Sequence, residues 1–147
     1  MRTLVLAAVL AAASPAHADR GPLGIGIIAG EPTGLTGEYR LSDRTAIDMA
    51  LGFDLFADRD LYVHADFLFI LPDLLGGGSV GLSPYLGPGA FLVAVHDVVL
   101  GARVPFGLSL DFTKAPLQIF IELAPRLEII PDVHLDLGGA LGFRYYF

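Results

Sequence analysis

The sequence contains no cysteine and no tryptophan, and it has one lysine. Without cysteine there can be no disulfide scaffold, no thiolate zinc site and no cysteine nucleophile. Nine Lys and Arg stand against sixteen Asp and Glu, and the formal charge of −7 argues against nucleic acid as a partner, because nucleic acid requires a basic face. The chain has 147 residues, the length of one domain. Of these residues 54% are hydrophobic, which makes the chain too apolar for an ordinary soluble domain.

The chain also lacks an apolar run that would suit a membrane-spanning helix. The longest uncharged stretch after the first residues, Leu74–Val95, is long enough to span a bilayer but contains six glycines and two prolines. Each glycine costs about 1 kcal/mol and each proline about 3 kcal/mol in a helix interior. The stretch therefore does not predict a transmembrane helix.

The first residues have the pattern of a secretory signal peptide. Met1-Arg2 is a basic start, Leu4–Ala13 is an apolar run, and Ala16-His17-Ala18 is a small-x-small cleavage motif. The apolar run is too short to cross a bilayer, which takes about 20 residues. We expect residues 1–18 to be cleaved on export and residues 19–147 to form the folded domain.

In the rest of the chain, apolar residues recur at every second position, which is the period of a β-strand with one apolar face. In the clearest case Ile47, Met49 and Leu51 alternate with small or acidic residues. Eight strands are predicted: Leu23–Ala29, Leu35–Leu41, Ala46–Leu55, Leu61–Ile70, Tyr85–Val93, Val99–Leu108, Leu117–Ala124 and Leu135–Phe147. Pro88 and Pro105 fall inside two of them and remove ladder donors, so we expect bulges or ragged edges there.

Alternation alone does not decide which face meets water, because a soluble sandwich or lipocalin-like barrel has the same period. A membrane barrel is favoured by the near absence of lysine, by the aromatic ladder at the end of the chain, and by the charges of both signs that stand among small residues on the polar face. Such charges suit a narrow barrel interior, where they can pair. The interior network expected comprises Glu38, Arg40, Asp48, His64, Asp66, Arg103, Glu122, Arg126, Glu128, Asp136 and Arg144.

The predicted fold is therefore all-β: an eight-stranded antiparallel up-and-down transmembrane β-barrel, with a lumen about filled by its own side chains. If both termini are periplasmic, the glycine-rich connection Pro72–Ser83 lies on the periplasmic side. Outer-membrane barrels usually have their long loops on the other side.

The export signal, the eight short strands and the terminal Tyr145-Tyr146-Phe147 resemble a small outer-membrane β-barrel of the OmpA/OmpX size class. The segments 30–37, 103–105 and 122–125 resemble an uncharacterised family of outer-membrane proteins from Gram-negative bacteria. The resemblance implies an outer-membrane location, outer-membrane lipids and the barrel-insertion machinery as partners, and a monomer without cofactors. It also implies that Phe143, Tyr145 and Phe147 form the insertion signal. It brings no catalytic residues.

Enzyme chemistry is not expected. A serine nucleophile needs a histidine at about 3 Å, but Ser42, Ser79, Ser83 and Ser109 are predicted at the periplasmic end, whereas His64, His96 and His134 are predicted at the other end. Two His-x-Asp pairs, 64/66 and 134/136, point inward from the fourth and eighth strands. Because these strands lie across the lumen from each other, we expect the pairs to belong to the polar network and not to one metal site.

Acidic residues gather at the predicted extracellular mouth and adjoining strand ends, namely Glu31, Asp54, Asp58, Asp60, Asp97, Asp132 and Asp136, with Arg59 the only base. Aspartate is common in turns, so solvated turn residues are the simpler interpretation, and a weak divalent-cation site is the alternative. For the whole chain the leading hypothesis is a non-enzymatic structural or surface-interaction protein of the outer membrane. A narrow channel or small-ligand barrel comes second, and a lipid-modifying enzyme third.

Overall fold

The computed structural model describes residues 20–53, 60–76, 78–94 and 98–147, and their regular structure is entirely β-strand. The strands are β1 (Leu23–Gly30), β2 (Thr33–Arg40), β3 (Thr45–Phe53), β4 (Leu61–Ile70), β5 (Val80–Leu86), β6 (Gly89–Ala94), β7 (Val98–Arg103), β8 (Phe106–Phe112), β9 (Leu117–Ile130) and β10 (His134–Tyr146). Within the described residues, no helix is long and apolar enough to cross a membrane.

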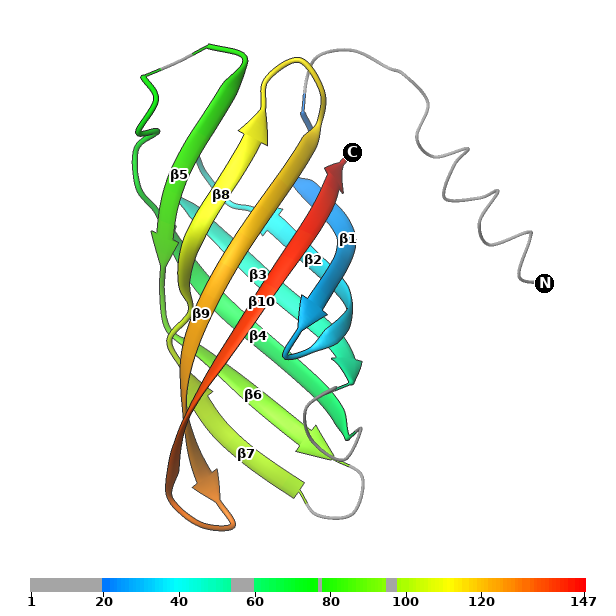
Figure 1. The fold of residues 1–147 in the computed structure, drawn as a ribbon, viewed down its shortest axis with the longest axis vertical. Helices are drawn as coiled ribbons and strands as arrows, with labels where there is room; N and C mark the ends of the chain where they lie inside the picture. The colour runs from blue at the N-terminus through cyan, green and yellow to red at the C-terminus, as the bar shows by residue number, and fades with distance from the viewer. Residues whose placement is uncertain (1–19, 54–59, 77, 95–97) are drawn as a thin grey trace, which may run out of the picture.

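The strands pair antiparallel in a ring (Figure 1). From β10 the order runs through β1, β2 and β3 to β4, which pairs with both β5 and β6. Then β5 pairs with β8 and β6 with β7, and both β7 and β8 pair with β9. The pairing of β9 with β10 completes the ring, which confirms the predicted antiparallel β-barrel class.

Ten strands make an eight-membered ring because two members are interrupted. The break between β5 and β6 is at Gly87-Pro88, and the break between β7 and β8 is at Val104-Pro105. Proline has no N–H to donate, but its carbonyl still accepts: the Phe67 N–H bonds to the Pro88 carbonyl at 2.8 Å, and the Gly87 N–H bonds to the Pro105 carbonyl at 3.2 Å. Pro88 and Pro105, which were predicted inside two strands, therefore interrupt the hydrogen-bond ladders of those strands.

The strand boundaries differ from the predicted ones mainly on one side of the ring. The prediction for β4 matches, whereas β9 continues past Ala124 to Ile130. The connection predicted as Pro72–Ser83 is shorter, because Val80 already begins β5 and pairs with Phe112 of β8. The predicted end of the third strand at Leu55 lies outside the described residues.

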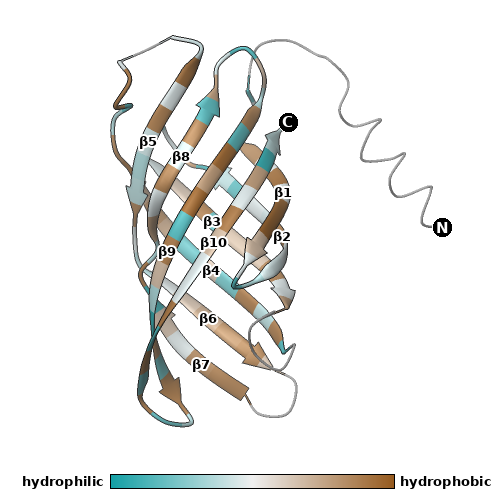
Figure 2. Cartoon of the chain, in the orientation of Figure 1, coloured by the Kyte–Doolittle hydropathy of each residue, from teal (hydrophilic) through white to brown (hydrophobic). Residues whose placement is uncertain are grey.

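The apolar face of the ring points outward, away from the interior. On β3 the side chains of Ile47 and Met49 are 39% and 56% exposed, whereas Asp48 between them is 1% exposed. Figure 2 shows apolar and polar positions alternating along most strands. A soluble barrel would place the apolar set inside, so this polarity is the inverse of that in a soluble protein.

Candidate functional site

The interior of the ring is polar and packed. The polar and charged residues buried in it are Thr36, Glu38, Asp48, His64, Asp66, Arg103, Ser109, Gln118, Glu122, Arg126 and Arg144. They come from β2, β3, β4, β7, β8, β9 and β10, and each occupies an inward position of its strand's alternation. Buried charges are costly unless they are paired, so the partners of each one decide what the interior can do.

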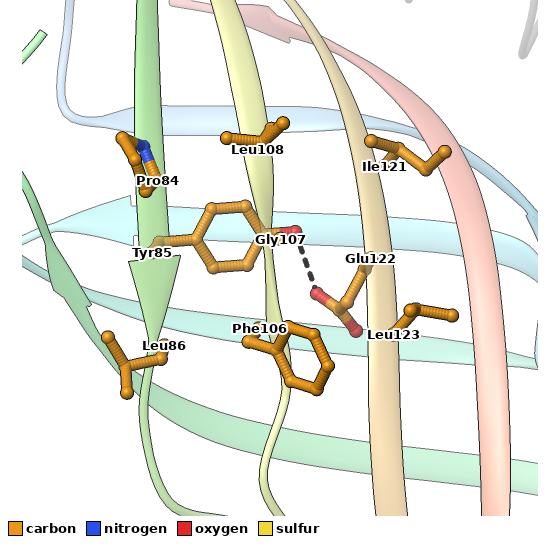
Figure 3. A pocket seen from close by; sticks show the side chains of 9 residues that line it. All are labelled: Pro84, Tyr85, Leu86, Phe106, Gly107, Leu108, Ile121, Glu122 and Leu123. Atoms are coloured by element: carbon orange, nitrogen blue, oxygen red, sulfur yellow. Dashed lines mark hydrogen bonds between the residues drawn. The ribbon is translucent and has the colours of Figure 1, made fainter. Parts of the chain in front are cut away.

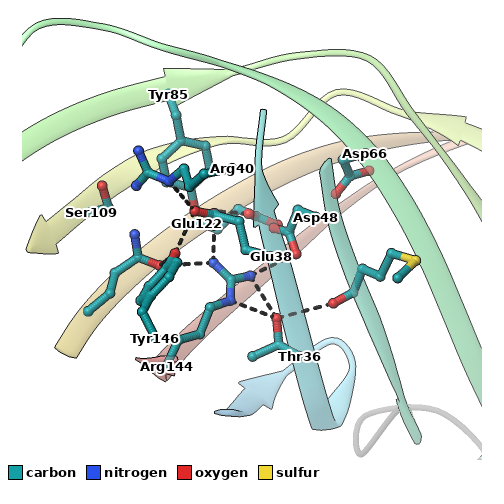
Figure 4. Close-up of polar contacts among 12 residues, drawn as sticks. Thr36, Glu38, Arg40, Asp48, Asp66, Tyr85, Ser109, Glu122, Arg144 and Tyr146 are labelled. Carbon is teal, nitrogen blue, oxygen red and sulfur yellow. Dashed lines mark hydrogen bonds and ion pairs between the residues drawn. The ribbon is translucent and has the colours of Figure 1, made fainter. Parts of the chain in front are cut away.

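Arg144 on β10 lies at the centre of the largest group of polar contacts (Figure 4). Its guanidinium donates to Glu38 Oε2 at 3.0 Å, to Asp48 Oδ1 at 2.7 Å and to Gln118 Oε1 at 3.0 Å. It also donates twice to the Thr36 hydroxyl, at 3.1 and 2.6 Å. We call these five residues the Arg144 cluster. Every guanidinium nitrogen has a partner, which is the condition under which a buried charge is tolerated.

The Arg144 cluster continues toward the end of the barrel at which β10 ends (Figure 1). The Tyr146 hydroxyl donates to Glu38 Oε1 at 2.5 Å, and the Arg40 Nε donates to the same oxygen at 2.6 Å. Arg20 pairs with Asp111 at 2.6 Å and lies over the Tyr146 ring, 3.6 Å from its centroid. Arg20, the second residue after the predicted signal peptide, thus helps to close this end of the interior.

A second group lies in the middle of the barrel around Arg103 of β7. Arg103 Nε is 3.1 Å from Asp66 Oδ1, NH1 donates to the Tyr62 hydroxyl at 3.2 Å, and NH2 donates to Glu122 Oε1. The other Glu122 oxygen accepts a bond of 2.9 Å from the Tyr85 hydroxyl. We call Tyr62, Asp66, Tyr85, Arg103 and Glu122, together with His64, the Arg103 cluster.

Tyr85 reaches Glu122 by crossing β8 at Gly107 (Figure 3). A Cβ atom built on Gly107 would lie 2.7 Å from the Tyr85 hydroxyl and 2.2 Å from the Ile121 carbonyl oxygen. A side chain at this position would push the ring away from Glu122. The apolar groove of about 420 Å³ around these residues lies among outward side chains such as Pro84, Leu108 and Leu123, outside the polar interior.

A third group lies toward the opposite end, around Arg126 of β9. One guanidinium nitrogen bonds Glu31 Oε2 at 3.0 Å and Asp136 Oδ2 at 2.7 Å. The guanidinium also lies 5.5 Å from the Tyr62 ring centroid and 5.7 Å from that of Phe91, within the range of cation–π contact. Glu31 and Asp136, two acids expected at the rim, therefore both contact an interior arginine.

The other residues of the predicted rim and insertion signal are placed as follows. Asp132 is exposed in the turn between β9 and β10, and Asp60 is partly exposed next to β4. Asp54, Asp58 and Asp97 lie outside the described residues. Phe143 and Phe147 are exposed on the outer face, and the Tyr145 and Phe147 rings pack edge to face with centroids 5.2 Å apart.

Eight of the eleven predicted interior residues are buried, whereas Arg40 and Glu128 are partly exposed. The prediction that His134 and Asp136 point into the interior is wrong, because both are exposed near the tip of the β9–β10 hairpin. Sequence reasoning also missed several uncharged interior residues. Glu128 of β9, one of the predicted members, is half-buried beyond Arg126. Thr36, Ser109 and Gln118 were not singled out, although each fits the inward alternation of its strand. Extending that alternation through every polar residue would have found them. In the described residues, the one group of three metal-ligand side chains close to one another is His64, Asp66 and Glu122.

Comparison with known proteins shows the fold but no family. No family model matches the sequence. The chain is 32% identical over 112 residues to the ribosome maturation factor RimM of Rhodospirillum rubrum, a match that covers 65% of this chain. The chain spans about half, 51%, of the length of that relative. Among solved structures, it is similar to the N-terminal β-barrel domain of Pseudomonas aeruginosa OprF. The TM-score is 0.58 at 13% identity, over 88% of this chain and 100% of that domain.

Proposed function

We propose that this protein is a non-enzymatic β-barrel of the bacterial outer membrane, with a plugged and charge-paired interior and a structural or surface-interaction role. The observation that carries the proposal is the inverted polarity of the barrel, with large apolar side chains outside and paired charges inside. Monomeric soluble proteins rarely expose contiguous apolar patches of more than a few hundred Å². An outer-membrane barrel requires such a band on every strand.

The packed interior supports a structural role over a pore. An eight-stranded ring leaves a lumen just wide enough for its side chains. Here three arginines, at positions 103, 126 and 144, lie buried across that lumen with their carboxylate partners. A narrow channel remains the second candidate, and conductance measurements distinguish it.

The hairpin of β9 and β10 supports a surface-interaction role. β1 pairs with β10 only as far as Gly30 opposite Ala140, whereas β10 and β9 pair on to His134. The hairpin therefore extends beyond β1 at the end of the barrel opposite the C-terminus (Figure 1). It remains apolar near its tip, where Val133 and Leu135 are 78% and 71% exposed. This is the surface we propose for contact with lipids or other molecules outside the cell.

The proposed function of this chain does not include the ribosome maturation role in the name of its Rhodospirillum rubrum relative. Binding to RNA would require a basic surface. This chain has a formal charge of −7, and its exposed face is apolar. Neither property favours RNA as a partner.

Cell fractionation and planar-bilayer recording test the proposal together. We expect the protein in the outer-membrane fraction, with heat-modifiable gel migration and no discrete conductance. Phe147→Asp should block assembly, because a charge would replace the last aromatic residue of the proposed insertion signal, whereas Leu74→Asp, in the exposed connection before β5, should assemble normally. A soluble protein, or equal assembly of both variants, would contradict the outer-membrane proposal. Discrete conductance steps would replace the structural role with a channel.

A further inference from the structure

His64 is a buried histidine whose ring nitrogens are not satisfied. The residue is 2% exposed, and neither Nδ1 nor Nε2 makes a hydrogen bond to any described residue. Nδ1 lies 3.0 Å from Asp66 Oδ2, but the ring N–H does not point at that oxygen. Two ligand atoms of one tetrahedral zinc ion are about 3.3–3.6 Å apart, because zinc binds nitrogen and oxygen at about 2.0–2.2 Å, so this pair lies a few tenths of an ångström closer than a shared ion requires.

Glu122 supplies a third ligand from across the barrel. One ligand atom each from His64, Asp66 and Glu122 lies within 4.8 Å of the others, and all three residues are buried. Ligand atoms of one tetrahedral zinc ion lie about 3.3–3.6 Å apart, so a movement of about 1 Å closes the set. His64 and Asp66 come from β4 and Glu122 from β9.

Arg103 contacts both carboxylates of this set, since its NH2 donates to Glu122 Oε1, but it leaves Asp66 Oδ2 and the two His64 nitrogens to an ion. Arg103 lies against Asp66 Oδ1, whereas His64 faces Asp66 Oδ2. With a metal bound, Arg103 and Tyr85 would remain as hydrogen-bond donors to the carboxylates, as outer partners do in metal sites. Gly89 makes room for this geometry, since a Cβ built there would lie 1.7 Å from Asp66 Oδ1.

The charges in this part of the interior also favour a cation. The buried carboxylates are Glu38, Asp48, Asp66 and Glu122, and their arginine partners among the described residues are Arg40, Arg103 and Arg144. These carboxylates outnumber their arginine partners by one, and Asp48 stands directly opposite Asp66 in the β3–β4 ladder.

We infer that His64, Asp66 and Glu122 form a buried site for one divalent first-row metal ion, with zinc as the representative. Imidazole together with carboxylates suits such ions better than calcium or magnesium, which prefer oxygen ligands alone. The inference goes beyond the proposed function and does not depend on it, because it requires only the folded interior.

The test is to refold the purified protein in detergent with zinc or with EDTA, to desalt it, and to measure bound zinc and thermal unfolding. We expect one zinc per chain after refolding with zinc, and a higher melting temperature than after refolding with EDTA. Cobalt in place of zinc should give visible d–d absorption bands. If neither ion is retained, the inference is wrong, whatever the location of the protein in the cell.

Matched variants decide whether the ion sits where we place it. His64→Gln and Asp66→Asn should each weaken zinc binding by roughly tenfold or more. His134→Gln changes the exposed histidine of the other His-x-Asp pair and should retain zinc fully. Heat-modifiable migration reports whether each variant has folded, and Glu122→Gln replaces any variant that has not. Equal retention by His64→Gln and His134→Gln, or equal loss, would overturn the assignment.

Discussion

Arg144 and Arg103 are both 2% exposed in the same interior, yet their surroundings differ in how fully the polar groups are satisfied. Each nitrogen of Arg144 donates a hydrogen bond, and Glu38 beside it accepts from Tyr146 and Arg40 as well. A fully satisfied polar network rigidifies its surroundings and specifies one arrangement. The Arg144 cluster thus has the properties of a structural plug.

The polar groups of the Arg103 cluster are only partly satisfied by hydrogen bonds. Its contacts to Tyr62 and Glu122 are hydrogen bonds, but both oxygens of Asp66 and both ring nitrogens of His64 have no hydrogen bond to the described residues. Unsatisfied buried polar groups cost free energy and need an explanation. One barrel interior can thus contain a cluster that stabilises the fold and a second cluster that binds a further cation.

The largest expected loss of stability follows from a change in the Arg144 cluster, whose polar groups are fully satisfied. Arg144→Met leaves Asp48 without a cation and Glu38 with Arg40 alone, and removing one partner of a buried pair costs about 3–5 kcal/mol. Unfolding by urea in detergent, followed by circular dichroism, should show this loss of stability. Arg144→Lys retains the charge without the forked geometry and should fall between the variant and the wild type. An unchanged urea midpoint for Arg144→Met would show that the cluster does not stabilise the fold.

The next largest loss of stability is expected from a change in the Arg103 cluster, whose polar groups are partly unsatisfied. Arg103→Met should cost about 2–3 kcal/mol, toward or below the lower end of the range for broken buried pairs, because Glu122 still accepts from Tyr85. Added zinc should recover part of this loss, since the ion would replace the missing positive charge beside Asp66. The same addition should do nothing for Arg144→Met. Recovery in both variants would mean that zinc acts elsewhere, and a larger loss for Arg103→Met than for Arg144→Met would reverse the comparison.

The two clusters also differ in how far the sequence could predict them. Alternation with period two assigns Asp48, Asp66 and Arg144 to the inner face, because a strand presents alternate side chains to opposite sides. It does not say which inner residues meet across the lumen. Glu122 lies 58 positions from His64, and their contact depends on the stagger of strands around the ring, which no local pattern encodes.

The same limit explains the acids predicted at the rim. In the sequence Glu31 and Asp136 resemble turn and strand-end residues, and Asp-rich turns are common for local reasons. The contact of Glu31 depends on Arg126, which is 95 positions away in the sequence, and Asp136 bonds to the same arginine while it stays exposed. The fold class was predictable from local periodicity, whereas the pairing of charges required the register.

A smaller effect tests single donors in the two clusters. Tyr85→Phe removes a hydroxyl that donates to Glu122, and a hydrogen bond to a charged group contributes about 1.5–3 kcal/mol. Tyr146→Phe removes the corresponding donor to Glu38, but Glu38 retains both Arg40 and Arg144, so its loss should lie at or below the low end of this range. Urea midpoints of the two variants, compared directly, give the ranking. A larger loss for Tyr146→Phe would mean that the better satisfied cluster is the more sensitive one.

The smallest expected effect is at His64, and it separates a structural histidine from a ligand. Without metal, His64→Leu replaces an imidazole that makes no hydrogen bond to the described residues with an apolar side chain of similar size. Removing an unsatisfied polar group in this way is nearly neutral or slightly stabilising, within about 1 kcal/mol. Asp66 retains Arg103, so no carboxylate is left without a cation. Thr36→Val is the matched change in the Arg144 cluster, and it should destabilise the protein because it removes the acceptor of two Arg144 bonds. Both variants are compared with wild type in EDTA by urea unfolding. If His64→Leu costs as much as Thr36→Val in EDTA, then His64 stabilises the fold without metal, and the contrast between the two clusters fails.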